Sequence, residues 1–231
     1  MNLLRFFIFL GMFLLFTACN NNKLYQSLSE RELIKKNNIK RQMSYNATED
    51  SILHLTDIKT FNEQGYVVNH TVYNLDSTIS NYIIFEYDTN NNVVKEIGYQ
   101  GDSSLSYTTV RAYNKDKLME EVFYDAVSRI VGQTKNRYDA KGNKIETISY
   151  NHDGSTYIYT SEYDANNKEI KGMSYNHSGE LQLVYIYKYD LGGNLVEVSE
   201  HTSNGAMINI MLFKYDKNGN ETELLSKKAD G

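Results

Sequence analysis

The sequence of 231 residues contains no proline, no tryptophan and a single cysteine, Cys19. One cysteine cannot form an intramolecular disulfide, so no such cross-link holds this fold together. The absence of proline leaves every backbone N–H available to a β-ladder, which suits long uninterrupted strands. Tyrosine, in contrast, occurs 20 times, and tyrosine is a strong strand former. The composition therefore favours a protein built of β-strands.

An excess of positive charge is also missing, since the formal net charge is −5. Proteins bind nucleic acid chiefly by neutralising phosphates with lysine and arginine. We therefore expect no nucleic-acid partner. The same deficit leaves no basic patch for anionic lipid, so attachment to a membrane is expected to depend on a lipid chain.

Residues 1–18 have the features of a signal peptide. Arg5 precedes an apolar run over residues 6–16, and a run of that length is too short to cross a bilayer, which requires roughly 20 residues. The run ends in small residues just before a cysteine, in the order Phe16-Thr17-Ala18-Cys19.

This ending resembles the lipobox of bacterial lipoprotein precursors. The resemblance implies cleavage after Ala18 and acylation of Cys19, for instance with palmitate, which would anchor the protein in the bacterial cell envelope. Asn20 follows the cysteine where an inner-membrane lipoprotein often carries aspartate, which favours the outer membrane. An ordinary secretory signal with an incidental cysteine is the alternative.

A tether and a helix are expected to follow. Residues 19–23 form the predicted tether, and residues 24–37 form a predicted helical cap over the first repeat. Ser29 and Glu32 have the spacing of a capping box at a helix start. One helix face is expected to be apolar and to consist of Leu28, Leu33 and Ile34.

Residues 38–231 are predicted to form one β-repeat domain. A step of one aromatic residue followed by Asp or Asn recurs there every 25 or 26 residues. A fixed period of this size indicates a repeat architecture. The seven copies are Phe61-Asn62, Tyr87-Asp88, Tyr113-Asn114, Tyr138-Asp139, Tyr163-Asp164, Tyr189-Asp190 and Tyr215-Asp216.

Each period contains two stretches of strand type separated by turn residues. Between Tyr138 and Asp164, for example, turn sequences at 138–143 and 151–155 bound two strands. Strands joined by turns this short are antiparallel neighbours. The sequence therefore predicts an all-β fold, an antiparallel meander of about seven two-stranded repeats in a curled single sheet or solenoid, preceded by a short helix.

The Tyr-Asp-x-x-Gly-Asn segments at 138–143, 189–194 and 215–220 resemble the YD repeats of the RHS family. The second turn with its aromatic-rich strand is similar to MORN-type hairpin repeats. The resemblance covers about residues 38–224 and implies a structural or binding role without catalytic residues.

Two sets of residues have the composition of metal ligands. Residues 216–220 resemble a calcium loop, but they lack the glycine and the glutamate at the sixth and twelfth positions of an EF-hand. His152 and His177 occupy equivalent turns of neighbouring repeats, about 10 Å apart across two strands, too far for one zinc ion. We interpret both sets as turn residues and expect no metal and no cofactor.

Carboxylates recur on the first strand of the repeats. Pairs of carboxylates catalyse glycoside hydrolysis at separations of about 5–9.5 Å, so a glycosidase-like enzyme is one alternative. Lysines interrupt and flank the row, which favours a solvated face with cross-strand ion pairs. The row consists of Glu96, Glu121, Glu146, Glu197 and Glu223.

Tyrosines alternate on the second strands and form the candidate binding face. Rings on a sheet can stack on sugars or anchor a protein partner, although the same rings could instead fill a core. The sequence thus predicts a non-enzymatic, lipid-anchored scaffold or binding surface, with a carbohydrate- or peptide-binding lipoprotein and an immunity-type partner of a toxin as alternatives. The candidate residues are Tyr157, Tyr159, Tyr185 and Tyr187.

Overall fold

The computed structural model describes residues 26–47 and 52–229. The predicted signal peptide 1–18, Cys19 and the tether 19–23 lie outside the described residues. Their assignments therefore stay predictions.

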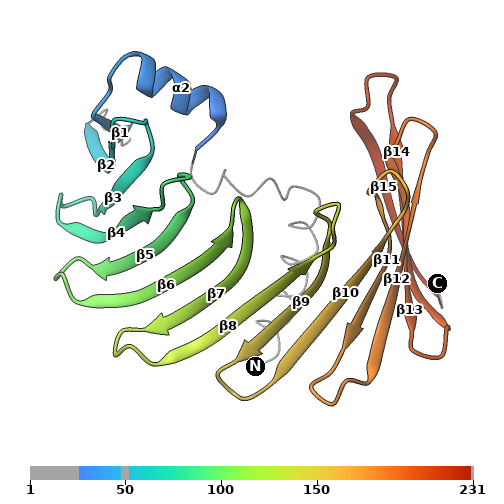
Figure 1. Ribbon diagram of the computed structural model, residues 1–231. Coiled ribbons are helices and arrows are strands. Elements are labelled where there is room, and N and C mark those ends of the chain that lie inside the picture. Colours follow the sequence, from blue (N-terminus) through green and yellow to red (C-terminus); the bar gives the residue numbers. More distant parts are fainter. Residues whose placement is uncertain (1–25, 48–51, 230–231) are drawn as a thin grey trace. The chain divides into compact units, whose positions relative to one another are not determined.

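The described chain contains one helix, α2 (Leu28–Lys36), and strands that follow one another as a meander (Figure 1). The order β1 to β15 describes a single 15-stranded, unclosed antiparallel sheet. This confirms the predicted all-β meander with one short helix near the N-terminus. The strands are β1 (Arg41–Ala47), β2 (Leu53–Phe61), β3 (Val67–Tyr73), β4 (Ile79–Tyr87), β5 (Val93–Gln100), β6 (Leu105–Asn114), β7 (Lys117–Asp125), β8 (Ile130–Tyr138), β9 (Lys144–Asn151), β10 (Thr156–Tyr163), β11 (Glu169–Tyr175), β12 (Leu181–Tyr189), β13 (Leu195–Thr202), β14 (Met207–Tyr215) and β15 (Glu221–Lys228).

The turns after the aromatic steps share one geometry except after Tyr113, where only Lys115 and Asp116 separate β6 from β7. In the turn after Tyr87, the Asp88 N–H donates to the Asn92 carbonyl at 3.0 Å, and the Asn91 N–H donates back to the Asp88 carbonyl at 3.0 Å. Asn91 has a φ of 65°, a left-handed conformation that asparagine and glycine tolerate better than other residues. The sequence can therefore alternate between these two residue types without changing the turn. The equivalent positive-φ residues include Gly65, Gly142, Asn167, Gly193 and Gly219.

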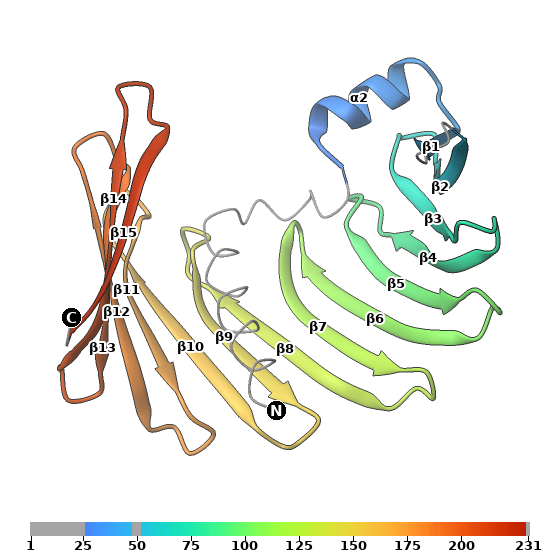
Figure 2. The ribbon, with the colours of Figure 1, turned by 180° about the vertical axis from the view of Figure 1, so that it is seen from behind.

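The chain divides into two compact units, one reaching Leu118 with residues 126–128, and one containing the remaining residues from Met119 onward. In the N-terminal unit, α2 lies beside the first strands (Figure 2). Its Ile34 is 5% exposed and packs with Phe61, Val67 and Phe85. Helix and sheet thus share one small apolar core.

The helix differs from its prediction in two details. Ser27, rather than Ser29, is the N-cap, and its Oγ accepts the Glu30 N–H at 3.1 Å. Ser27 and Glu30 have the same three-residue spacing as Ser29 and Glu32, so the motif alone left two possible starts. Of the three predicted face residues only Ile34 is buried, whereas Leu28 and Leu33 are 53% and 60% exposed.

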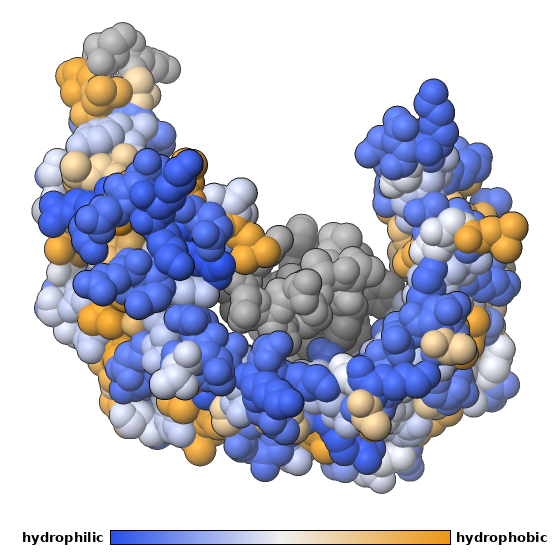
Figure 3. Space-filling model, turned by 45° about the horizontal axis from the view of Figure 1, so that its top comes forward, coloured by the Kyte–Doolittle hydropathy of each residue, from blue (hydrophilic) through white to orange (hydrophobic). Residues whose placement is uncertain are grey.

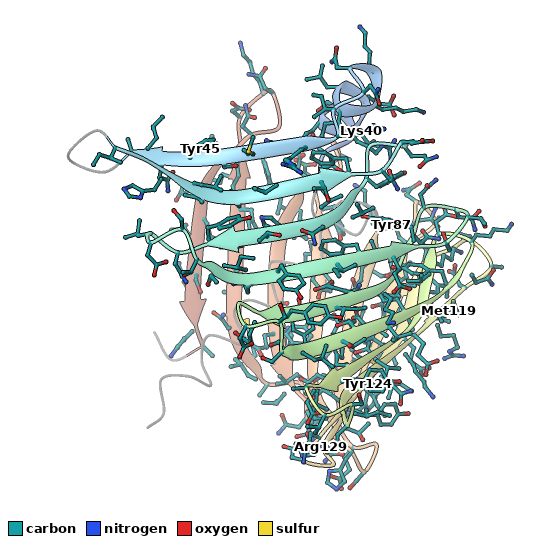
Figure 4. All side chains as sticks on the ribbon, turned by 90° about the vertical axis from the view of Figure 1, so that its left-hand side faces the viewer. Lys40, Tyr45, Tyr87, Met119, Tyr124 and Arg129 are labelled. Carbon is teal, nitrogen blue, oxygen red and sulfur yellow. The ribbon has the colours of Figure 1, made fainter. Side chains whose placement is uncertain are left out.

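A close backbone approach fixes α2 on the first turn of the sheet. Gly65 has a φ of 84°, and a Cβ there would lie 2.8 Å from the Arg31 carbonyl oxygen. Arg31 Nη1 donates to the Tyr66 hydroxyl at 2.6 Å. In Figure 4, Lys40 and Tyr87 lie toward the same ends of the strands in this unit. The turn that begins at Asn62, whose N–H donates to the Tyr66 carbonyl, lies at this end, since the Phe61 N–H donates to the Lys40 carbonyl. The helix therefore caps the strand ends of the first repeats.

The C-terminal unit consists of strands and turns in its described residues, which are 119–125 and 129–229. One face of its sheet carries the predicted tyrosines, since Tyr159 pairs with Ser174 and Tyr185 with Gly172. Hydrophilic residues cover much of the surface seen in Figure 3, with hydrophobic residues scattered among them. Within the described ranges, no helix is long and apolar enough to span a membrane.

Candidate functional site

The tyrosine of an aromatic step can join its repeat to the repeat before it. The Tyr189 hydroxyl donates to the Glu169 carbonyl at 2.8 Å, twenty residues earlier at the start of β11. Each hydroxyl thus satisfies a backbone acceptor of the preceding repeat, and we call this contact the tyrosine clasp. Clasps of 2.6–3.2 Å run from Tyr87 to Val67, Tyr113 to Val93, Tyr163 to Lys144, Tyr189 to Glu169 and Tyr215 to Leu195.

The Asp of the step holds the turn that follows. Asp190 Oδ1 accepts the Asn194 N–H at 2.8 Å, and Oδ2 accepts the Asn194 side-chain amide at 2.9 Å. These hydrogen bonds to the ionised carboxylate lower the pKa of Asp190. Asp216, in the segment that resembles a calcium loop, accepts the Asn220 N–H and the Asn220 side-chain amide in the same way, and it also accepts the Asn218 N–H. The aspartates of the step therefore serve the turns.

The two turn histidines, His152 and His177, are solvent-exposed. His177 Nε2 lies 3.2 Å from the Ser178 hydroxyl. Over residues 26–47 and 52–229, no three His, Cys, Asp or Glu side chains are grouped so that they could hold a metal ion.

The predicted row of carboxylates divides between the two faces of the sheet. Glu146, Glu197 and Glu223 form cross-strand ion pairs with Arg137, Lys188 and Lys214 at 3.1, 2.9 and 2.8 Å. These pairs match the predicted solvated face. Exposed pairs of this kind each contribute only about 0–1 kcal/mol to stability.

Glu96 lies on the other face, and the prediction of a single row is wrong for it. Its carboxylate is 6% exposed, accepts the Tyr107 hydroxyl at 2.6 Å and lies 3.2 Å from Arg111 Nη2. Glu96 stands three residues before Tyr99, whereas Glu146 stands four residues before Tyr150. An offset of one residue moves a side chain to the opposite face of a strand. Glu121, three residues before Tyr124, has the same offset and pairs with Thr134.

The four candidate tyrosines lie on one face of the C-terminal unit. The hydroxyls of Tyr159 and Tyr187 are 2.9 Å apart. The rings of Tyr159 and Tyr185 have centroids 6.2 Å apart and are tilted by 42°. Tyr185 is 6% exposed, while Tyr157, Tyr159 and Tyr187 are half-buried. Tyr159, Tyr185 and Tyr187 thus lie close together and meet through hydroxyls and tilted rings, and Tyr157 stands two residues before Tyr159 on the same strand.

Glu169 belongs to this group, although sequence reasoning did not include it. The Tyr159 hydroxyl donates to Glu169 Oε1 at 3.1 Å. Burial raises the pKa of the Glu169 carboxyl, against the opposing effect of hydrogen bonds from Ser161 and Tyr159. The equivalent positions of other repeats hold Val67, Val93, Lys144, Leu195 and Glu221, so the position alone gave no signal, and the contact with Tyr159 is what identifies Glu169. We call Tyr157, Tyr159, Tyr185, Tyr187 and Glu169 the tyrosine–glutamate cluster.

Glycine makes room for the cluster. Tyr159 lies directly over Gly172, where a Cβ would collide with the phenol ring and its oxygen. Burial raises the pKa values of Tyr159, Tyr185 and Tyr187 above the ordinary value for tyrosine, and it raises the pKa of Tyr163 to about 12. These phenols therefore stay protonated at neutral pH. They act as hydrogen-bond donors and acceptors and as apolar contact area.

Comparisons with known proteins give one partial family match. Residues 150–200, which include the cluster strands β10 and β11, match a family described as a protein of unknown function (DUF2963). No curated protein matches the chain.

Solved structures that resemble the chain include large toxin components and a porin-like protein. A crystal structure of TcdB2–TccC3 without its hypervariable C-terminal region is 11% identical, with a TM-score of 0.31, over 82% of this chain and 14% of that one. A Photorhabdus luminescens Tc holotoxin pore is also 11% identical, with a TM-score of 0.29, and the match again covers 82% of this chain and 14% of that one. A porin-like protein from Bacteroides uniformis is 11% identical in sequence, with a TM-score of 0.31, over 81% of this chain and 55% of that one. The chain thus spans a small part of the toxin chains, and these similarities carry no argument about activity.

Proposed function

We propose that this protein is a non-enzymatic, lipid-anchored scaffold of the bacterial envelope that binds a polypeptide partner through the tyrosine–glutamate cluster. One observation carries the binding role. In the C-terminal unit, a face rich in phenol groups is built on a sheet whose described residues supply no helix to cover it. Half-buried tyrosines with hydrogen-bonding hydroxyls are typical of residues that anchor protein interfaces.

A scaffold role is supported by the contacts of the tyrosine, aspartate and glutamate side chains, which hold the repeats and their turns together. The step tyrosines donate to backbone carbonyls, as Tyr215 does to Leu195 at 2.9 Å. The step aspartates hold turns, and the carboxylates of the opposite face are paired with cations, as Glu197 is with Lys188. Each of these contacts stabilises the repeat array, which fits a structural protein better than a hydrolase.

The carbohydrate alternative makes a different demand on geometry. Stacking on sugar faces calls for exposed rings in a common plane, whereas Tyr159 and Tyr185 are tilted by 42° and Tyr185 is 6% exposed. A protein partner can use hydroxyl edges and tilted rings. The polypeptide is therefore the occupant that we propose.

The anchor depends on the resemblance of Phe16–Cys19 to a lipobox and is tested by fractionation. The full chain is expected in the membrane fraction as an acylated, shortened form. A Cys19→Ser variant should lose acylation and accumulate as the uncleaved precursor. Acylation that persists in that variant would show that the lipid is attached elsewhere or that the anchor is of another kind.

The binding role is tested with matched tyrosine variants. Envelope extract is passed over the immobilised full chain, over Tyr187→Phe, and over Tyr215→Phe as a control that removes a clasp hydroxyl of the same unit. We expect a discrete polypeptide retained by the wild type and the control, and reduced about fivefold by Tyr187→Phe, since one hydrogen bond contributes about 1 kcal/mol. If no retained polypeptide depends on Tyr187, the assignment of this face is wrong. A glycan array read in parallel would then test the carbohydrate alternative.

A further inference from the structure

The strand β15 at the edge of the described sheet has exposed apolar residues. Among residues 26–47 and 52–229, β15 pairs with β14 alone. Leu224 and Leu225, in the middle of β15, are 53% and 39% exposed. An edge strand presents unpaired N–H and C=O groups, and exposed leucines add apolar area to it. Such an edge can pair with another strand.

The charges on β15 are separated by sign. Glu221 and Glu223 precede the two leucines, and Lys227 and Lys228 follow them. In an antiparallel pair of two identical strands, the acidic half of each lies opposite the basic half of the other. Lysine on an edge strand ordinarily discourages pairing, but in this arrangement the lysines of one strand approach the acidic half of its partner. We propose that β15 pairs antiparallel with β15 of a second copy of this chain, forming a two-fold symmetric dimer.

The charge order also selects a register. Directly opposite residues of an antiparallel ladder share a face, so a two-fold axis must pass through a residue rather than between two. An axis at Leu225 places Glu223 opposite Lys227 of the partner subunit, twice by symmetry. Glu223 already lies 2.8 Å from Lys214 of its own chain on that face. An axis at Leu224 would place Glu223 opposite a leucine, and Glu221, which has the matching number for Lys227, lies on the opposite face because of the register shift beside Tyr215.

The other edge of the sheet is a poorer partner for β15. In antiparallel pairing with β1 (Arg41–Ala47), the first residue, Arg41, approaches the last residues of β15, which are Lys227 and Lys228. Like charges directly opposite are destabilising. The charges thus favour a closed dimer over head-to-tail growth of an open filament.

Cysteine cross-linking tests the pairing and its register. The full chain in detergent carries Cys19→Ser, so that each introduced cysteine is the only thiol. Under mild oxidation Leu225→Cys is expected to form a disulfide-linked dimer, because this residue faces its own copy. Leu224→Cys lies on the opposite face, and Leu191→Cys lies in a fully exposed turn. Both variants should give a yield of disulfide-linked dimer at least about fivefold lower, because a disulfide forms only over a narrow range of distances. Equal yields at all positions, or a higher yield at Leu224→Cys, would overturn the proposal.

Charge reversal separates pairing from folding. In the Leu225→Cys background, Lys227→Glu is expected to lower the dimer yield about tenfold, since two attractive pairs become two repulsive ones. The double variant Glu223→Lys/Lys227→Glu should restore the yield. Glu197→Lys loses an equivalent intrachain ion pair away from the edge and should leave the yield unchanged. A double variant that stays as weak as Lys227→Glu, with wild-type circular dichroism, would contradict the proposed pairing.

Discussion

Removal of one hydroxyl, in Tyr189→Phe, tests whether the tyrosine clasp stabilises the repeat array. The hydroxyl donates to the Glu169 carbonyl at 2.8 Å, while Lys168 Nζ lies 4.7 Å from the centre of the ring. Phenylalanine keeps the ring and its contact with lysine, so the hydrogen bond is the main loss. A hydrogen bond contributes about 1 kcal/mol net, and a buried acceptor left unsatisfied costs more. Because Tyr189 is half-buried, we expect a loss of about 1–1.5 kcal/mol.

For a chain of this size, that loss corresponds to a fall in Tm of about 2–6 °C. Urea unfolding followed by circular dichroism gives the free energy, and hydrogen exchange should show faster exchange in β11. Tyr175→Phe is the matched control, because among residues 26–47 and 52–229 the Tyr175 hydroxyl donates to the weak acceptor Met173 Sδ alone, at 3.5 Å. It should lose less than about 0.5 kcal/mol. Equal small losses in both variants would refute a stabilising clasp.

Three further changes address the turn, the carboxyl group and the glycine of the same unit. Asp190→Ala removes two acceptors of the turn and should lower the free energy of unfolding, whereas Asp190→Asn should lower it by less than half as much in urea unfolding, because Asn176 accepts equivalent backbone bonds. The folded pKa of Glu169 is raised by burial, so ionisation opposes folding above that pKa and has no effect below the unfolded value. Glu169→Gln should therefore stabilise the protein at pH 8, and the gain should shrink as pH falls toward 4; a gain independent of pH would contradict the assignment. Gly172→Ala places a methyl group against Tyr159 and should cost about 1–3 kcal/mol, less in a Tyr159→Ala background, with thermal unfolding as the measurement.

Acid should destabilise the turns as a group. Hydrogen bonds lower the folded pKa of Asp190 and Asp216 below the ordinary value of 3.8. A carboxylate with a depressed folded pKa contributes stability that is present above its unfolded pKa and lost as pH falls through the folded value. As pH falls, protonation of these aspartates lowers the stability, whereas protonation of Glu169 raises it, and the aspartates titrate at lower pH.

The repeat period and the turn chemistry made most of the fold predictable. Alternation and the aromatic step located the strands, because hairpins with a fixed period permit few other arrangements. The left-handed residues explain why steps without glycine fold alike, as at Asn167 with a φ of 62°.

Single-residue offsets limited the prediction of the faces. Glu96 and Glu146 look equivalent when only the strand is considered, but counting from Tyr99 and Tyr150 separates them. The helix start had the same difficulty, since two serine–glutamate pairs overlap there. Glu169 was missed because its burial depends on Tyr159, which reaches it from the neighbouring strand.

Site-specific photo-cross-linking tests the central claim, that the tyrosine–glutamate cluster binds a polypeptide partner in the envelope. A photoreactive phenylalanine analogue is placed at Tyr157 in cells, and at Leu191, a fully exposed turn residue of the same unit, as the control. We expect one discrete protein adduct at position 157 and none of that mass at 191. No adduct at 157, or the same adducts at both positions, would contradict it.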